Sequence, residues 1–164
     1  ATPSRLLGHG QLEQLAAIHQ NAFELLGQAI EASGACLDIA GCLPPLAGSY
    51  RDQPARSFED LQDEYAVLVK HQAAADVLLI ETMTNTLEAC AACAAASELG
   101  KPFSVAFRLE ADGKLMSGET LAEANGAGQL QTGIGPHGDC RLRRGLHRNN
   151  RLGEVLQASF ADRR

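Results

Sequence analysis

A short run of aliphatic residues that ends on an acid constrains this chain more than any other feature. Val77 to Ile80 reads VLLI, and Glu81 and Thr82 follow it at once. An uninterrupted aliphatic run of this length is typical of a strand buried on both faces, as in a parallel sheet. Because α/β proteins place their chemistry at the carboxyl ends of such strands, Glu81 is predicted to lie at a functional site.

The residues after this strand predict a helix that leads the chain away from the acid. Asn85 and Thr86 are suitable helix caps, and residues 87–99 are rich in alanine. Strand, acid, cap and helix together form one βα unit with a polar site at its mouth.

Helices and strands are predicted to alternate along most of the chain. Residues 1–10 are turn-like, and residues 42–57 are a long loop with three prolines. Periodicity and breaker residues predict helices over 11–32, 58–74, 85–99 and 117–124, and strands over 35–41, 75–82 and 103–109. Such alternation indicates an α/β fold with a parallel sheet, either doubly wound or part of a barrel. With 164 residues the chain is short for a closed (β/α)8 barrel of about 250 residues.

Composition excludes several classes of protein. The net charge of −6 gives no support to nucleic-acid binding. No apolar stretch approaches the roughly 20 residues of a membrane span. Five cysteines at scattered positions favour reduced thiols in a cytoplasmic protein over a disulfide framework.

The charge balance reverses near Gly126. Residues 1–128 hold 7 Lys+Arg and 17 Asp+Glu, a net of −10, whereas residues 129–164 hold 7 Arg and 3 Asp+Glu, a net of +4. We therefore divide the chain into a domain over 1–125 and a divergent Arg-rich tail over 126–164. The tail is read as a basic binding extension, a disordered segment or sequence that is out of frame, and a shifted frame or truncation near Gly126 is our hypothesis.

Glu81 is the sharpest candidate for a site residue. A carboxylate after four aliphatic residues is partly desolvated, so a cation is expected to meet it: a substrate ammonium group, or a structural Lys or Arg. Thr82 and Thr84 would add hydroxyl groups to a substrate site. Gly41 and Cys42, at the end of the preceding strand, are placed to shape its mouth, although no His is identifiable as a base for Cys42.

The spacing of Cys90 and Cys93 suggests a metal or redox pair, but a packing role is the better interpretation. Both lie in the alanine-rich helix, where residues three apart share one face, and no second pair stands at zinc-site spacing. Buried cysteines of this kind pack as small apolar residues.

Three segments together resemble the homocysteine S-methyltransferase family: AGCLPPLAGSYR (40–51), ADVLLIETMTNTLEA (75–89) and GKPFSVAFRLEADGKLMSGETLAEA (100–124). The resemblance implies a (β/α)8 TIM barrel that binds L-homocysteine and a methyl donor at its C-terminal face and transfers the methyl group to sulfur, giving methionine. Residues 1–124 would supply strands three to five, a partial barrel of about three βα units. Glu81 would hold the homocysteine amino group, and Thr82, Gly41 and Cys42 would complete the substrate-binding residues.

The resemblance also implies a zinc ion that this chain is not equipped to hold. Family members bind zinc through one cysteine of an Asn-Cys strand end and two of a later Gly-Gly-Cys-Cys, and neither motif is present. Cys140 matches neither motif. We therefore expect no zinc ligand, no catalytic residue and no turnover by this chain, and we expect two unpaired edges on its three-stranded sheet.

Two other functions stay open at this point. The first is a non-catalytic binding or scaffold fragment that associates with copies of itself to cover its sheet edges. The second is an unrelated, metal-independent α/β enzyme that uses Glu81 as a general base. Sedimentation or scattering that shows a stable compact monomer would weaken the first alternative. Homocysteine binding that depends on Glu81 would weaken the second.

Overall fold

The computed structural model describes residues 1–49, 55–126, 140–145 and 155–160. Helices and strands alternate through its central part. In chain order the elements are α1 (Pro3–Gly8), a 3-10 turn η1 (Leu12–Gln14), α2 (Leu15–Ser33), β1 (Ala40–Leu43), α3 (Phe58–Lys70), β2 (Val77–Met83), α4 (Thr86–Glu98), β3 (Phe103–Phe107), α5 (Leu121–Gly126), β4 (Cys140–Gly145) and β5 (Val155–Phe160).

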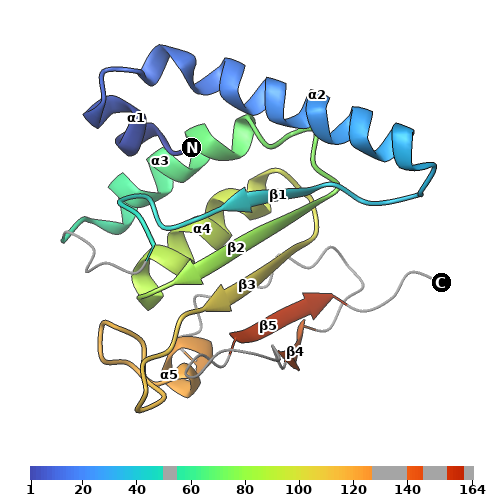
Figure 1. The fold of residues 1–164 in the computed structure, drawn as a ribbon. Helices are drawn as coiled ribbons and strands as arrows, with labels where there is room; N and C mark the ends of the chain where they lie inside the picture. Colours follow the sequence, from blue (N-terminus) through green and yellow to red (C-terminus); the bar gives the residue numbers. More distant parts are fainter. Residues whose placement is uncertain (50–54, 127–139, 146–154, 161–164) are drawn as a thin grey trace.

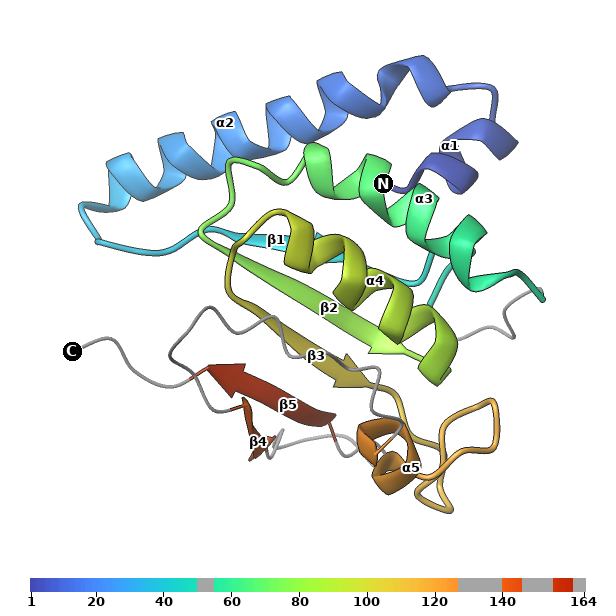
Figure 2. The same cartoon turned by 180° about the vertical axis from the view of Figure 1, so that it is seen from behind.

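The first three strands form the parallel sheet that the alternation predicted. The strand order is β1-β2-β3-β5-β4, and β2 pairs in parallel with both β1 and β3. Helix α3 joins β1 to β2 and α4 joins β2 to β3, and both helices lie on the same face of the sheet (Figures 1 and 2). The described part of the chain is therefore a mixed α/β fold with three parallel strands in an open sheet.

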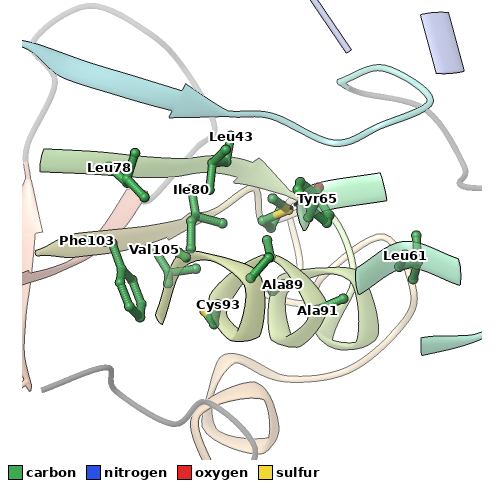
Figure 3. Close-up of a cluster of buried hydrophobic side chains, with 14 of the residues drawn as sticks. Leu43, Leu61, Tyr65, Leu78, Ile80, Ala89, Ala91, Cys93, Phe103 and Val105 are labelled. Carbon is green, nitrogen blue, oxygen red and sulfur yellow. Dashed lines mark hydrogen bonds between the residues drawn. The ribbon is translucent and has the colours of Figure 1, made fainter. Parts of the chain in front are cut away.

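The core lies between this sheet and its two helices. Alternate strand residues, such as Leu78 and Ile80 of β2 and Phe103 and Val105 of β3, are buried toward the helices (Figure 3). Helix α4 meets them with small side chains, which lets it pack closely on the sheet. Cys93 is one of these core residues, so its predicted packing role is confirmed.

The opposite face of the parallel strands carries the other alternate residues. Cys42, Leu79, Glu81 and Ala106 are only half-buried there, because α3 and α4 cover the reverse face (Figure 2). This face, called the open face below, is where the candidate site lies. None of the described helices is long and apolar enough to cross a membrane.

The first ten residues were predicted to be turns, and that prediction is wrong over most of its length. Pro3–Gly8 is helix α1, started by a proline in its first turn, where the missing N–H costs nothing. The hydroxyl of Thr2 donates to the carbonyl of Leu46 at 2.9 Å, and Leu6 is buried. Long-range contacts of this kind are invisible to local sequence patterns.

Element boundaries moved wherever tertiary pairing decides them. The first strand was predicted over 35–41 but runs over Ala40–Leu43, because its pairing with β2 begins at Ala40 opposite Val77. The last helix begins at Leu121 rather than near residue 117. A capping box sets that start: the Thr120 hydroxyl accepts from Glu123 N, and the Glu123 carboxylate accepts from Thr120 N.

The Arg-rich tail contains two described strands. β4 and β5 form an antiparallel pair, and β5 pairs with β3 at Ala106 opposite Gln157. The edge of β3 is therefore paired, against the prediction that both sheet edges would be open. The rest of the predicted tail, 127–139, 146–154 and 161–164, lies outside the described residues.

Two glycines offer a matched test of the packing. A β-carbon on Gly41 would lie 2.6 Å from Gln72 Oε1, 2.9 Å from Ala75 Cβ and 3.0 Å from Leu78 Cδ2, whereas one on Gly27 in α2 would meet nothing within 4 Å. We expect Gly41→Ala to lower the free energy of unfolding by about 1–3 kcal/mol through overpacking. Gly27→Ala should raise it by roughly 0.5–1 kcal/mol, because alanine favours a helix interior. Urea unfolding of both variants measures this difference, and equal effects would contradict the packing at Gly41.

A buried histidine ties the N-terminus to the turn that follows α3. His19 Nδ1 lies 3.1 Å from the amide nitrogen of Gln72, a donor, so Nε2 carries the ring proton and donates to the Ala1 carbonyl at 3.1 Å. Burial lowers the pKa of His19 from its usual 6.5. The unfolded chain therefore binds the second ring proton, which gives His19 its positive charge, more readily than the folded protein does.

That pKa difference predicts a pH dependence of stability. The contribution of His19 is fully present above about pH 6.5 and is lost as the pH falls toward its folded pKa. We expect His19→Gln to flatten the decline in unfolding free energy between pH 7 and 5. The exposed His9→Gln is the control. An unchanged pH profile in His19→Gln would contradict the neutral, buried state of His19.

Candidate functional site

Glu81 lies on the open face, near the carboxyl end of the middle parallel strand. Strand β2 has β1 on one side and β3 on the other, so a side chain at its end has a strand on both sides. Glu81 is half-buried. The neighbouring strand places Cys42 beside it, and the Cys42 thiol donates a hydrogen bond to Glu81 Oε1 at 2.9 Å.

No cation meets this carboxylate within the described residues. The ion pairs of the described chain join Arg56 to Glu64 and Arg108 to Glu110. No described residue donates a hydrogen bond to Glu81 Oε2. A carboxylate that is half-withdrawn from water and lacks a cation has the capacity to bind one from a ligand.

The Cys42 thiol is held in its neutral form. Burial, followed by the hydrogen bond and the charge of Glu81, raises the pKa of Cys42 to about 12. Its nucleophilic and metal-binding form is the thiolate, which is scarce at neutral pH when the pKa is so high. Cys42 is therefore a hydrogen-bond donor to Glu81.

Thr82 breaks the regular strand directly after Glu81. Its φ of 56° lies in the left-handed region, and the pairing of β2 with β3 shifts register between Ile80 and Met83. A β-branched residue in this conformation is strained, and such strain clusters at functional sites. The Thr82 hydroxyl lies 3.0 Å from that of Ser49, which ties the loop after β1 to the site.

Ser49 is a polar residue that the sequence analysis did not select. Its only signal is its place in the proline-containing loop that follows β1. Two predicted residues lie elsewhere: the α-carbon of Gly41 faces Gln72 and Leu78 on the helix side, and Thr84 is buried with its carbonyl accepting from Ser117. The structure thus brings Glu81 and Cys42 together, whereas the hydroxyl group of Thr82 contacts Ser49, and Gly41 and Thr84 face elsewhere.

A second carboxylate, missed by the sequence analysis, lies buried in the same βα unit. Glu88 Oε1 accepts from the backbone N–H of Leu46 at 2.8 Å and from the Tyr65 hydroxyl at 3.3 Å. The Asn85 side chain accepts from Glu88 N at 2.7 Å, which confirms Asn85 as the cap of α4. Burial raises the pKa of Glu88 above its usual value despite these hydrogen bonds. The Asn85-x-x-Glu88 spacing of a capping box was the available signal.

Glu88 borders a cleft of about 390 Å³ on the helix side. Its lining comes from the loops after β1, β2 and β3 and from the first turns of α3 and α4, and includes Leu46, Leu61, Asn85 and Ser117. Neither Glu81 nor Cys42 lines it. The cleft and the open-face site are therefore separate features of the same end of the sheet.

The four cysteines whose side chains are described do not converge on a metal site. Among the described residues, no group of three His, Cys, Asp or Glu side chains is placed to hold an ion. Cys36 is exposed, while Cys90 and Cys93 are buried in α4. Cys42 is separated from all three by its place on the open face and its hydrogen bond to Glu81.

Comparison with known proteins identifies the family. The model of the family described as homocysteine S-methyltransferase matches residues 1–135, which is most of the chain and extends beyond the predicted boundary at residue 125. No curated protein matches the chain. Together with the acid at the end of a parallel strand, this match shows that the chain belongs to the homocysteine S-methyltransferase family.

Proposed function

We propose that this chain binds L-homocysteine and that the Glu81 carboxylate anchors the ammonium group of the amino acid. The observation that carries the proposal is the half-buried Glu81, whose Oε2 has no donor among the described residues. An ammonium group supplies both the charge and the N–H donors that such a carboxylate lacks. Thr82 follows Glu81 along β2, and we include its hydroxyl group, 3.0 Å from that of Ser49, in the proposed site.

The reaction that this site would serve is methyl transfer to the homocysteine sulfur, giving methionine. The support for that reaction is membership of the family. We also propose that the three parallel strands form part of a (β/α)8 barrel, with the open face turned toward the barrel interior. On this proposal, Glu81 points to the region that a bound amino acid would occupy in a complete barrel.

The described residues do not fit the zinc ion that the family uses. A zinc site that activates a thiol needs ligands that converge at about 2.0–2.3 Å from the metal. Cys36 is exposed, Cys42 lies beside Glu81, and Cys90 and Cys93 are buried in α4, and the described residues hold no cluster of three ligands. We therefore assign the amino-acid-binding half of the site to this chain and derive no step through zinc.

A titration with two matched ligands tests the proposal. We expect L-homocysteine to bind with one-to-one stoichiometry in isothermal titration calorimetry. 4-Mercaptobutanoate, which lacks only the α-amino group, should bind at least about tenfold more weakly, because a hydrogen bond to a charged group contributes about 1.5–3 kcal/mol. Equal affinities for the two ligands would refute the ammonium contact.

Metal analysis tests the proposal that this chain binds the amino acid but not zinc. We expect protein purified at neutral pH to hold far less than one zinc per chain and to form no methionine from homocysteine and S-methylmethionine. The physical reason is the lack of converging thiolates among the described cysteines. Stoichiometric zinc together with methionine formation would contradict this expectation.

A further inference from the structure

We propose that Cys42 is a positioning residue whose neutral thiol fixes the orientation of Glu81 and so presents Glu81 Oε2 to the ammonium group of the bound amino acid. This inference rests on the proposed function and adds a residue to it. The observation beneath it is the 2.9 Å hydrogen bond from Cys42 Sγ to Glu81 Oε1. Because this bond uses one carboxylate oxygen, it leaves the other for the ligand.

The position of the thiol is set by the backbone on which it stands. Cys42 pairs with Leu79 in the ladder between β1 and β2, so its side chain shares the open face with Leu79 and, two residues further on, Glu81. The Gln72 amide donates to the Cys42 carbonyl at 3.4 Å. The neighbouring Gly41 packs so closely on Gln72 that even a β-carbon would clash there. The donor is thereby held on a rigid strand.

The chemistry of a thiol suits this task. A lysine or arginine at position 42 would pair with Glu81 and compete with the ligand ammonium for its charge. A carboxylate there would repel Glu81. A thiol is a weak neutral donor, so it orients the carboxylate without neutralising it. With a pKa raised to about 12 by burial and by Glu81, Cys42 keeps its proton throughout the neutral range.

The hydrogen bond to Glu81 also argues against two other roles for Cys42, those of zinc ligand and nucleophile. A zinc ligand or a nucleophile must act as thiolate, and the adjacent carboxylate opposes that form. Cys42 instead acts through its proton. Its effect on the ligand is indirect and passes through the orientation of Glu81.

Two substitutions separate the hydrogen bond from simple packing. Cys42→Ala removes the donor, and we expect it to weaken L-homocysteine binding by about 5- to 10-fold, the size of one modest hydrogen bond. Cys42→Ser keeps a donor of similar size, and its affinity should stay within about twofold of the original protein. Cys36→Ala, at an exposed cysteine outside the site, is the matched control and should change nothing. Thermal melting of each variant verifies that it is folded.

A spectroscopic readout follows the hydrogen bond itself. The S–H stretching band of Cys42, isolated by subtracting the infrared spectrum of Cys42→Ala, should move to higher frequency in Glu81→Gln, because the carboxylate acceptor is gone. The pKa of the Cys42 thiol, followed by thiolate absorbance, should fall in the same variant. After burial, the hydrogen bond to Glu81 and the charge of Glu81 are the next largest causes of the raised pKa. A cysteine without a hydrogen bond to Glu81 would show neither change.

The outcomes distinguish this inference from the function on which it rests. Weak binding by Cys42→Ala, near-normal binding by Cys42→Ser and a shifted S–H band support the positioning role. If Cys42→Ala binds homocysteine normally while Glu81→Gln does not, the positioning role is refuted and the ammonium anchor stands. If the unmodified protein does not bind homocysteine, the proposed function is refuted, and the role of Cys42 toward a ligand falls with it.

Discussion

Replacing Glu81 with glutamine should weaken the binding of L-homocysteine by roughly 10- to 100-fold. The carboxylate is half-buried, accepts only the Cys42 thiol among the described residues and has no described cationic partner. A hydrogen bond to a charged group contributes about 1.5–3 kcal/mol, and the neutral amide of glutamine removes most of that contribution. Isothermal titration calorimetry at pH 7 measures the loss directly.

The control for this variant is Glu98→Gln, at the exposed end of α4. It removes the same charge from the chain but should leave the affinity unchanged. Glu81→Gln should also remain as stable as the original protein, because it exchanges a charge that has no cationic partner among the described residues for a neutral group of the same shape. Full affinity in a folded Glu81→Gln protein would remove the basis for the ammonium anchor.

Replacing Glu88 with alanine should lower the free energy of unfolding by about 2–4 kcal/mol, since it combines a cavity with unsatisfied buried donors. Glu88 is 1% exposed and joins three parts of the fold through its carboxylate: the loop after β1 at Leu46, helix α3 at Tyr65 and the cap of α4 at Asn85. Without it, the Leu46 N–H loses its acceptor. Urea unfolding at pH 7 is the measurement.

Glu88→Gln separates the hydrogen bonds from the charge. Glutamine keeps an oxygen for Leu46 and Tyr65, so its stability at pH 7 should lie much closer to that of the original protein than to that of Glu88→Ala. The raised pKa of Glu88 adds a pH signature. The protonated form is favoured in the folded state, so this contribution is present below about pH 4.5 and is lost as the pH rises through the folded pKa.

The pH profile of Glu88→Gln therefore lacks one decline that the original protein has as the pH rises above about 4.5. This trend opposes that of His19, whose contribution is lost as the pH falls below about 6.5. Comparing the two single variants with the original protein resolves the two contributions. Equal stability of Glu88→Ala and Glu88→Gln at pH 7 would show that the buried hydrogen bonds contribute nothing.

The strand that carries Glu81 near its end was predictable because its signals are local. The same βα unit is indicated by the four aliphatic residues, by the acid that follows them and by the cap at Asn85. The structure has β2 and α4 close to the predicted positions. The sequence predicted the residues of the candidate site less completely than it predicted this strand and helix. Cys42 and Gly41 are adjacent in sequence but point to opposite faces of β1, and choosing between them requires the register with β2.

The features that the sequence analysis missed depend on contacts between distant segments. The left-handed Thr82 has no signal in a run of threonines, and Ser49 reaches it across 33 positions in the chain. Glu88 was hidden because an acid in the first turn of a helix ordinarily faces solvent, whereas here Leu46 and Tyr65 enclose it. The pairing of β5 with β3 likewise joins segments that have no common pattern.

The two carboxylates of this βα unit, Glu81 and Glu88, have different surroundings and therefore different roles. Glu88 is enclosed and accepts hydrogen bonds from three side-chain or backbone groups, so it stabilises the fold. Glu81 faces the open side with one oxygen that no described residue satisfies. Of the two, only Glu81 is left with binding capacity for a ligand.

A crystal structure of the full chain with L-homocysteine tests that claim most directly. We predict that the ammonium nitrogen of the ligand lies within about 2.7–3.2 Å of Glu81 Oε2, with Oε1 still bonded to the Cys42 thiol. A ligand bound in the cleft beside Glu88, or an ammonium group paired with a different carboxylate, would contradict the account.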